Sequence, residues 1–392
     1  MMIPRHAKTA LLRFAKGYPV VALTGPRQSG KTTLARAVFP RKPYVSLEDP
    51  DQSEYAARDP RGFLARFPDG AVLDEAQRCP PIFSYIQTMV DSDRRPGLFV
   101  LTGSQQFGLL SKITQSLAGR VALVQLLPFS LGELPGGGSR AGKIDPLLIK
   151  GFYPPLYDRD LDPSPWYANY VMTYVERDVR QLVNVRELGA FQRFLRMCAA
   201  RTGQLLNLSG LANDCGITHN TARSWISVLE ASYIVFLLRP HFRNFGKRIV
   251  KTPKLYFFDT GLASWLLGLR DADHLAIHPM RGALFESFVV GEFIKGRFHR
   301  GESSDLFFWR DGSGNEIDLV VDRGGTLVPV EIKSGQTVAS DFFSGLRKWA
   351  SIAGKAGGPL HLVYGGDKSH IREGVSVHSW RTLPEAVRST FL

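Results

Sequence analysis

The stretch from Val20 to Leu34 constrains the fold of this chain more than any other. Its first residues are aliphatic and β-branched, which is typical of a buried strand, and they run into the spacing G-x-x-x-x-G-K-T at residues 25–32. Glycines at this spacing allow a sharp strand-to-helix turn, in which main-chain N–H groups and the helix dipole converge on a phosphate. We therefore predict a nucleotide-binding loop formed by Gly25, Pro26, Arg27, Gln28, Ser29, Gly30, Lys31, Thr32 and Thr33.

Four side chains of this region have distinct expected roles. Lys31 is predicted to reach the β- and γ-phosphates, and Thr32 is predicted to bind Mg²⁺. A second apolar run, residues 71–73, ends in Asp74 and Glu75. Carboxylates in this position place an aspartate beside the nucleotide's Mg²⁺ and a glutamate beside the attacking water. The sequence thus predicts a site that binds and hydrolyses ATP with Mg²⁺.

A third apolar strand is predicted at residues 98–101, and it ends in small hydroxyl residues. A polar side chain between the two phosphate-binding strands could hold water against the γ-phosphate. We assign this sensor role to Ser104, with Thr102 as the alternative.

The composition is that of a basic globular protein. The 392 residues carry a formal net charge of +13, which favours an anionic partner, and nucleic acid is the usual one where the charges cluster. Cys79, Cys198 and Cys215 are isolated, so neither a disulfide framework nor a zinc site is predicted. Apolar runs are too short to cross a bilayer and no signal segment is recognisable, so we expect a cytoplasmic protein without membrane contact.

Several motifs together carry a family resemblance. L-D-E-A-Q at residues 73–77, L-T-G-S at 101–104, L-A-G-R-V at 117–121 and P-F-S-L-G-E-L at 128–134 accompany the G-P-R-Q-S-G-K-T loop. In this combination the chain resembles a widespread prokaryotic family of AAA+-type ATPases that carry a C-terminal domain of unknown function. The resemblance covers nearly the whole chain and implies a fold more firmly than a function.

ATPases of this class usually complete their site with an arginine from a neighbouring subunit, because an added cation stabilises the charge that develops during phosphoryl transfer. The resemblance therefore implies a homo-oligomer, of which a hexameric ring is one form. Arg120 is our first choice for this arginine or for a nucleotide sensor, ahead of Arg94, Arg95 and Arg177.

The middle region contains a pattern of helix, glycine-containing turn and helix at residues 208–229. It resembles a winged helix-turn-helix, in which Thr218 caps the second helix and the exposed start of that helix meets DNA. The following stretch, residues 239–254, has six basic residues and no acidic one, as expected for a basic wing. The predicted DNA contacts are His219, Asn220, Arg223, Arg243, Lys247, Arg248, Lys251 and Lys254. A purely structural helical pair is the alternative.

The last region carries a second set of acidic residues. Asp318 lies on one predicted strand, and Glu331 and Lys333 share one face of the next strand because strand side chains alternate. This arrangement resembles the PD-(D/E)xK nuclease fold, with Glu286 in the position of its helix acid. In that reading Glu286, Asp318 and Glu331 hold Mg²⁺ and Lys333 orients or polarises water.

The fold class predicted from these patterns is α/β with three parts. They are a P-loop AAA+-type ATPase domain at residues 1–138, a helical linker and winged helix-turn-helix domain at 139–272, and a PD-(D/E)xK nuclease-like α/β domain at 273–392. The function expected is an oligomeric, DNA-binding ATPase that remodels or cleaves DNA, with branched DNA as one substrate. The alternatives are a nucleotide-dependent protein-interaction switch and a DNA-binding regulator, each with an inactive nuclease-like domain.

Overall fold

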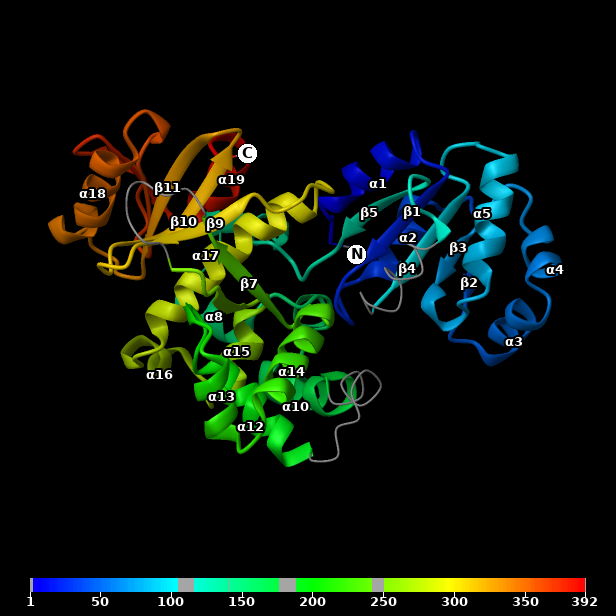
Figure 1. The fold of residues 1–392 in the computed structure, drawn as a ribbon, viewed down its shortest axis with the longest axis horizontal. Coiled ribbons are helices and arrows are strands. Elements are labelled where there is room, and N and C mark those ends of the chain that lie inside the picture. Colours follow the sequence, from blue (N-terminus) through cyan, green and yellow to red (C-terminus); the bar gives the residue numbers. More distant parts are fainter. Residues whose placement is uncertain (1–2, 105–115, 141, 176–187, 242–249, 392) are drawn as a thin grey trace.

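The computed structural model describes residues 3–104, 116–140, 142–175, 188–241 and 250–391 (Figure 1). Two sheets organise it, and they lie at opposite ends of the longest axis. The first is a five-stranded sheet near the N-terminus, and the second is a nine-stranded sheet built from the rest of the chain.

The first sheet is parallel, with the strand order β2-β3-β4-β1-β5. Alternate side chains of its central strand enter two cores: Val20 and Ala22 pack toward one face, and Val21 and Leu23 toward the other. Helices cover both faces, which explains why this strand is apolar throughout. The elements are β1 (Val20–Thr24), β2 (Tyr44–Ser46), β3 (Val72–Asp74), β4 (Phe99–Gly103), β5 (Val121–Gln125), α1 (Ala7–Ala15), α2 (Lys31–Val38), α3 (Pro50–Arg58), α4 (Pro60–Ala65), η1 (Ala76–Arg78) and α5 (Ile82–Ser92).

The second sheet has the order β13-β14-β12-β11-β10-β9-β7-β8-β6. Its strands are β6 (Gln204–Leu205), β7 (Val235–Pro240), β8 (Lys254–Phe257), β9 (Leu306–Arg310), β10 (Glu316–Arg323), β11 (Thr326–Lys333), β12 (His361–Tyr364), β13 (His370–Arg372) and β14 (Val375–Ser379). Strands β9, β10 and β11 form an antiparallel meander, and β12 lies parallel to β11.

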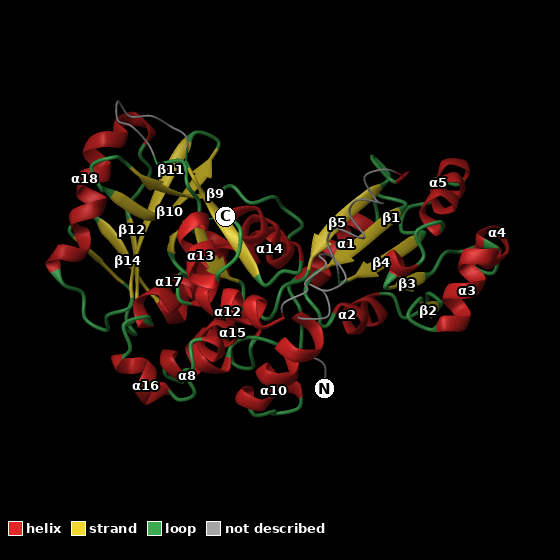
Figure 2. Ribbon diagram, turned by 60° about the horizontal axis from the view of Figure 1, so that its bottom comes forward, coloured by secondary structure: helices red, strands yellow, loops and turns green. Residues whose placement is uncertain are grey.

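Helices surround this second sheet (Figure 2). The longest is α17 (Arg281–Phe298), whose side chains are mostly buried. The others are η2 (Leu131–Glu133), α7 (Gly137–Arg140), α8 (Ile144–Lys150), α9 (Pro155–Asp158), α10 (Pro163–Tyr170), the π-helical η3 (Val171–Val175), α12 (Leu188–Ala199), α13 (Leu208–Cys215), α14 (His219–Ala231), α15 (Thr260–Leu266), α16 (Ala272–Ile277), η4 (Ser340–Phe343), α18 (Ser344–Ala353), η5 (Gly354–Ala356), η6 (Trp380–Thr382) and α19 (Leu383–Ser389).

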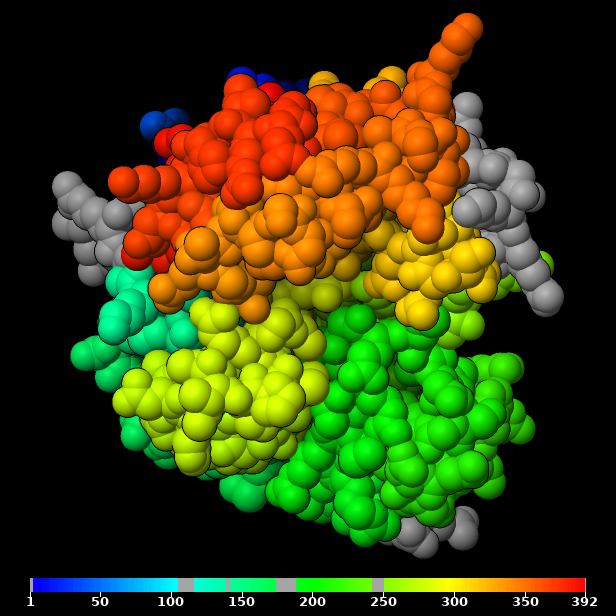
Figure 3. All heavy atoms as spheres, turned by 90° about the vertical axis from the view of Figure 1, so that its left-hand side faces the viewer, coloured from blue at the N-terminus to red at the C-terminus, as the bar shows by residue number. Residues whose placement is uncertain are grey.

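The middle and C-terminal parts of the chain share this sheet and one apolar core. Strand β7 pairs with β9, and one hydrophobic cluster runs from Leu127 to Phe391. Figure 3 shows the two parts in direct contact on the face opposite the first sheet. The domain boundaries stay a prediction, but sheet and core are continuous across residue 273.

The helix pair α13 and α14 forms where it was predicted. Gly216 ends the first helix in the left-handed conformation, with φ 68°. The Thr218 hydroxyl then accepts a hydrogen bond from the main-chain N–H of Thr221, so this residue caps the second helix as expected.

In the described part of the chain, no helix is both long and apolar enough to cross a membrane.

Candidate functional site

The predicted phosphate loop connects β1 to α2. Gly25 has φ 150°, and a Cβ atom there would lie 2.0 Å from the main-chain oxygen of Leu126, so the position accepts no side chain. Gly30 precedes α2 with φ 89°, a conformation that favours glycine. The ammonium of Lys31 bends back and donates hydrogen bonds to the carbonyl oxygens of Gly25 (3.0 Å) and Pro26 (2.8 Å). The loop therefore has the tight curvature that phosphate binding requires.

Asp74 accepts hydrogen bonds from the hydroxyl groups of three neighbouring elements. Thr32 at the start of α2 donates a hydrogen bond of 2.9 Å to Asp74 Oδ2, and Tyr44 of β2 donates one of 2.7 Å to the same oxygen. Thr102 of β4 donates to Oδ1. Burial and the contact with Asp74 raise the pKa of Tyr44. Oxygen atoms are the ligands that Mg²⁺ prefers, so the predicted pair of Thr32 and Asp74 fits this ion.

Glu75 lies directly after β3 and is held by the end of β4. Its Oε2 accepts a hydrogen bond of 2.9 Å from the Ser104 hydroxyl and another from the amide of Gln77. The structure thus separates the two sensor candidates, because the Ser104 hydroxyl donates to the Glu75 carboxylate whereas the Thr102 hydroxyl donates to the Asp74 carboxylate. Thr102 also accepts a hydrogen bond from the main-chain N–H of Glu75. Their proposed roles toward nucleotide stay predictions.

A buried arginine that the motifs did not reveal, Arg5, binds the main chain of the phosphate loop. Arg5 donates hydrogen bonds to the main-chain oxygens of Ser29 (2.7 Å) and Leu127 (2.6 Å), and its Nε lies 3.1 Å from Glu133 Oε1. Burial alone raises the pKa of Glu133, but nearby Arg5 together with His299 and His6 lowers it to about 2. This carboxylate is therefore ionised and ties the phosphate loop to the helical turn η2.

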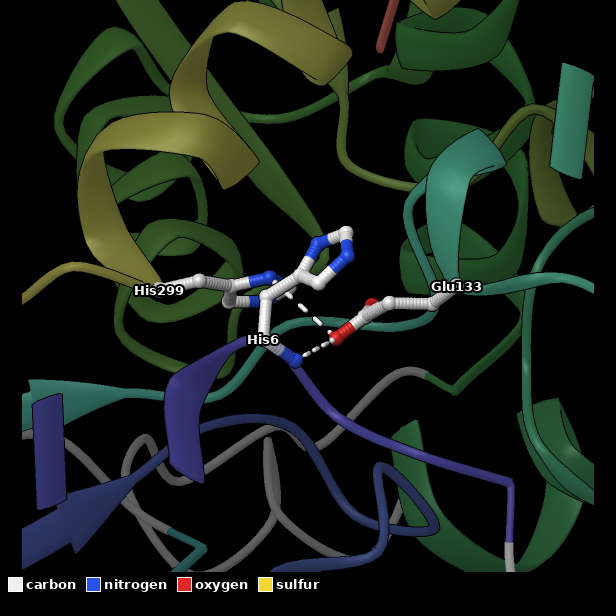
Figure 4. Close-up of side chains that lie close together, drawn as sticks. All are labelled: His6, Glu133 and His299. Carbon is white, nitrogen blue, oxygen red and sulfur yellow. Dashed lines mark hydrogen bonds and ion pairs between the residues drawn. The ribbon is translucent and has the colours of Figure 1, made fainter. Parts of the chain in front are cut away.

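Two histidines flank Glu133 (Figure 4). His299 Nδ1, at the end of α17, lies 3.7 Å from Glu133 Oε1, and burial lowers the pKa of His299 to about 3. His6, Glu133 and His299 bring three ligand atoms within 4.8 Å of one another. However, Glu133 Oε1 already accepts hydrogen bonds from Arg5 and the main chain of His6, and Oε2 accepts from Ser130. The Arg5 charge also disfavours a further cation, so we read this group as a structural link.

Arg120 lies at the edge of the first sheet that is away from the phosphate loop. It precedes Val121, which pairs with Val20, whereas the phosphate loop follows Thr24 at the opposite end of β1. At about 3.3 Å per residue the two positions are roughly 13 Å apart. The guanidinium instead pairs with Asp91 through Nε (2.5 Å) and Nη2 (2.9 Å). The sensor role and the action on a neighbouring subunit both stay predictions, and Arg177 lies outside the described residues.

The predicted nuclease-like residues come from three neighbouring elements, β10, β11 and α17. Lys333 Nζ lies 2.6 Å from Glu331 Oε1 and 3.7 Å from Asp318 Oδ2, and Asp318 also accepts a hydrogen bond from the main chain of Ile332. Burial, and the closeness of other carboxylates, raise the pKa values of Glu286 and Glu331. The arrangement concentrates negative charge in a largely buried space.

Lys254 belongs to this acidic cluster, so its prediction as a DNA contact was wrong. The residue is only 3% exposed. Strand β8 directs its ammonium inward, where it lies 3.0 Å from Glu286 Oε1, 2.5 Å from Glu316 Oε1 and 4.0 Å from Asp318 Oδ1. A buried charge needs such partners, whereas a phosphate contact needs an exposed one. Glu316 was not singled out by sequence, although it lies two residues before Asp318.

The other described DNA candidates remain on the surface. His219, Asn220, Arg223 and Lys251 are exposed. All but Asn220 line a groove of about 680 Å³ between α14, the start of α13, β7 and the residues that precede β8. Arg243, Lys247 and Arg248 lie outside the described residues.

Comparison with known proteins identifies the first part of the chain. Residues 17–135 match the family model of an AAA domain, residues 142–273 a domain of unknown function (DUF8612) and residues 281–383 a domain of unknown function (DUF4143). The Walker-type ATPase PABY2304 of Pyrococcus abyssi is similar in structure, with 15% identity over 68% of this chain and 96% of that chain and a TM-score of 0.47. The RuvB Holliday junction branch migration motor of Thermotoga maritima has 17% identity over 59% and 88%, with a TM-score of 0.29.

Two mycobacterial proteins are related along most of the chain. The uncharacterized proteins Rv2008c of Mycobacterium tuberculosis and Mb2031c of Mycobacterium bovis are each 35% identical over 342 residues, which is 86% of this chain and 75% of theirs. The expected AAA+-type ATPase domain is confirmed by the family match, while the nuclease-like assignment stays a prediction. The chain therefore belongs to the family of these two mycobacterial proteins, and its N-terminal third is an AAA+-type P-loop ATPase domain.

Proposed function

We propose that this protein is an Mg²⁺-dependent, homo-oligomeric ATPase that uses ATP hydrolysis to remodel DNA. The observation that carries the hydrolytic part is the position of Asp74 and Glu75. The Asp74 carboxylate accepts a hydrogen bond from the Thr32 hydroxyl, and the Glu75 carboxylate accepts one from the Ser104 hydroxyl. These are the groups that phosphoryl transfer to water requires on one edge of a P-loop sheet.

Each side chain then has one task. The main chain of the loop and the Lys31 ammonium hold the β- and γ-phosphates, and Thr32 and Asp74 provide oxygen ligands for Mg²⁺. Bound Mg²⁺ supplies positive charge against the phosphate oxygens. Glu75 orients water and accepts its proton, and the hydrogen bond from Ser104 fixes the carboxylate that does so.

The proposal for DNA rests on the groove beside α14. His219 and Arg223 lie on the first turns of the helix that a helix-turn-helix presents to DNA, and Lys251 faces them across the groove. Cations at such positions bind phosphates and release counterions, which makes affinity fall with salt by a log–log slope of about −0.9 per contact on duplex DNA.

DNA-stimulated hydrolysis tests this function. ATPase rates would be measured with duplex, single-stranded and four-way DNA for the wild type, Glu75→Gln and the double variant Arg223→Ala/Lys251→Ala, with exposed Lys348→Ala as the control. We expect DNA stimulation in the wild type and in the control. The double variant should keep basal hydrolysis but lose affinity for DNA and about two units of salt slope. Hydrolysis that no DNA stimulates would favour the protein-interaction switch.

A second candidate function is metal-dependent DNA cleavage. It is supported by the approach of Lys333 to both Glu331 and Asp318, and by the meander β9-β10-β11 followed by parallel β12. That succession after α17 resembles the core of PD-(D/E)xK nucleases. Cleavage in Mg²⁺ that Lys333→Ala abolishes would establish it, and cleavage that survives this substitution would refute it.

A further inference from the structure

Tyr233 follows the end of α14 and reaches from the core of the second sheet to the ATPase sheet. Its side chain is 2% exposed and belongs to the apolar core that the middle and C-terminal parts share. Its hydroxyl shares a hydrogen bond of 2.7 Å with the hydroxyl of Thr24, the last residue of β1, and accepts one of 3.3 Å from Gln125 Nε2 of β5. One buried side chain therefore connects the two sheets beside the phosphate loop.

The main chain of Tyr233 adopts a conformation that its surroundings must maintain. Its φ angle is 57°, in the left-handed region that a bulky residue rarely occupies. Such a conformation costs free energy and persists only where neighbouring contacts hold it. These contacts include the hydrogen bond to Thr24 and the ring of Phe258, whose centre lies 6.1 Å from that of Tyr233. The conformation of this turn thus depends in part on a residue of the ATPase sheet.

The turn that carries Tyr233 is also bonded to a wall of the groove beside α14. The main-chain N–H of Tyr233 donates a hydrogen bond of 3.0 Å to the carbonyl oxygen of Glu230, and that of Ile234 donates one of 2.9 Å to Leu229. Glu230 lines the groove together with Arg223. A change in this turn therefore bears directly on the groove wall.

On the other side, the residue after Thr24 is held by the lysine that we assign to the phosphates. The Lys31 ammonium donates hydrogen bonds to the carbonyl oxygens of Gly25 and Pro26. In the proposed function this ammonium holds the β- and γ-phosphates, so it gives up part of these contacts when ATP binds. Occupancy of the loop then acts on the main chain one residue away from Thr24.

We propose that the hydrogen bond between Thr24 and Tyr233 couples the nucleotide site to the groove beside α14, so that nucleotide and DNA each change the affinity for the other. The inference rests on the proposed function, which places ATP in the loop and DNA in the groove. Coupling between two binding sites is reciprocal, and it typically changes an affinity by about 5–150-fold. Tyr233 is a positioning residue, because it acts through Thr24 on one side and through Glu230 on the other.

Hydrogen–deuterium exchange tests the link without DNA. In the full-length chain, exchange of the main-chain N–H groups at residues 232–234 would be measured with and without a saturating non-hydrolysable ATP analogue and Mg²⁺. We expect the analogue to slow this exchange about fivefold or more in the wild type, because a loop fixed by nucleotide holds Thr24 in place. Tyr233→Phe should abolish the effect. Tyr153→Phe is the matched control and should retain it, since it removes a buried hydrogen bond of 2.9 Å to Tyr170 within the core of the second sheet.

Substitutions at Thr24 separate this hydrogen bond from a general loss of stability. Thr24→Val keeps the shape of the side chain but removes its hydroxyl, so the effect of the analogue on exchange should disappear. Thr24→Ser keeps the hydroxyl and should retain the effect. All variants are compared at saturating analogue, so that weaker nucleotide binding does not imitate lost coupling.

The second readout is the ratio of the DNA dissociation constants with and without the analogue. We expect this ratio to differ from one by about fivefold or more in the wild type and in Tyr153→Phe. In Tyr233→Phe and Thr24→Val it should be close to one. The ratio does not respond to a uniform loss of DNA affinity, so it reports the coupling alone.

Each outcome decides a different point. An analogue that leaves exchange unchanged in the wild type, or slows it equally in Tyr233→Phe, overturns the proposal. DNA that binds the wild type equally well with and without the analogue overturns it too, as does loss of the exchange effect in Thr24→Ser. A chain that binds no DNA but shows the expected pattern of exchange would instead refute the DNA function and leave the link between the loop and the groove wall standing.

Discussion

Arg5 and Glu133 form an ion pair in which the side chains are only 5% and 0% exposed, although 128 residues separate them in the sequence. The same guanidinium holds the main chain of Ser29 inside the phosphate loop. Glu133 also accepts the main-chain N–H of His6 at the start of α1. The pair therefore joins the nucleotide site to the segment that leads into the second sheet.

Removing one partner of this pair should cost far more than removing a surface pair. Arg5→Gln leaves the Glu133 carboxylate buried without its counter-charge, so we expect a loss of about 3–5 kcal/mol in the free energy of unfolding, measured in urea. Arg95→Gln is the matched control, because Arg95 pairs with Asp69 and Asp93 at the surface, where water screens the charges, and it should change the free energy of unfolding much less. Equal losses in the two variants would contradict the role of the buried pair.

Acid should destabilise the protein in two pH ranges. The pKa of His299 is lowered to about 3, so only the unfolded chain takes up this proton as the pH falls below about 6.5, and stability drops by up to about 1.4 kcal/mol per pH unit. The pKa of Glu133 is lowered to about 2, so its contribution is complete above about 4.5 and is lost only below that value.

His299→Gln separates these contributions. The variant should flatten the dependence of unfolding free energy on pH between about 6.5 and 4.5, where His299 titrates in the unfolded chain and Glu133 does not yet contribute. His361, whose pKa burial lowers to about 4, retains part of the slope. Exposed His274→Gln is the control for the change from histidine to glutamine itself. An unaltered slope in His299→Gln would mean that this imidazole is not buried in its neutral form.

Hydrolysis should depend on Glu75 and, less strongly, on its hydrogen-bond donor. Glu75→Gln is expected to lower kcat by about 10²–10⁴-fold while ATP still binds, because the amide cannot accept the water's proton. Ser104→Ala removes the 2.9 Å hydrogen bond to Glu75 and should lower kcat by a smaller factor. Steady-state rates and nucleotide titrations measure both effects. A Ser104→Ala enzyme with unchanged kcat but weaker ATP binding would place Ser104 at the nucleotide rather than at Glu75.

Gly25 should tolerate no side chain. A Cβ atom there would meet the Leu126 carbonyl oxygen at 2.0 Å in backbone that cannot give way, so Gly25→Ala is expected to distort the loop and abolish ATP binding. Gly291→Ala is the control, since outside its own helix turn no heavy atom of the described residues lies within 4 Å of its Cβ position in α17. This substitution should stabilise the helix by about 0.5–1 kcal/mol. Fluorescent-nucleotide binding and thermal unfolding distinguish the two. Normal ATP affinity in Gly25→Ala would contradict the close approach to Leu126.

The sequence predicts the phosphate loop well because the loop depends on main-chain conformation, which a few consecutive residues with glycines at fixed positions determine. Asp74 and Glu75 are equally local, since a strand ending in two acids places them at the loop edge of a parallel sheet. The contact of Tyr44 with Asp74 could not be predicted, because it depends on the pairing of β2 with β3, in which Ser46 lies beside Asp74. The role of Arg5 could not be predicted for a similar reason. Its partner Glu133 is distant in sequence and appears only as a member of the motif P-F-S-L-G-E-L.

Lys254 marks a different limit of sequence reasoning. It lies three residues after Lys251 in a stretch that has basic residues and no acidic one, and both residues are lysines. The antiparallel pairing of β8 with β7 and the packing against α17 turn one inward and leave the other exposed. Charge density along a sequence therefore predicts a basic surface only on average, and burial decides for each residue.

The unbroken nine-stranded sheet has a mechanical consequence. Pairing of β7 with β9 joins its two halves, so the groove beside α14 and the acidic cluster on β8, β10 and β11 belong to one hydrogen-bonded unit. The contacts between this unit and the ATPase sheet include the hydrogen bond of 2.7 Å between the hydroxyls of Thr24 and Tyr233. Arg5 adds hydrogen bonds to the main-chain oxygens of Ser29 and Leu127. A displacement that begins at the phosphate loop would therefore reach the groove and the acidic cluster together, through these contacts.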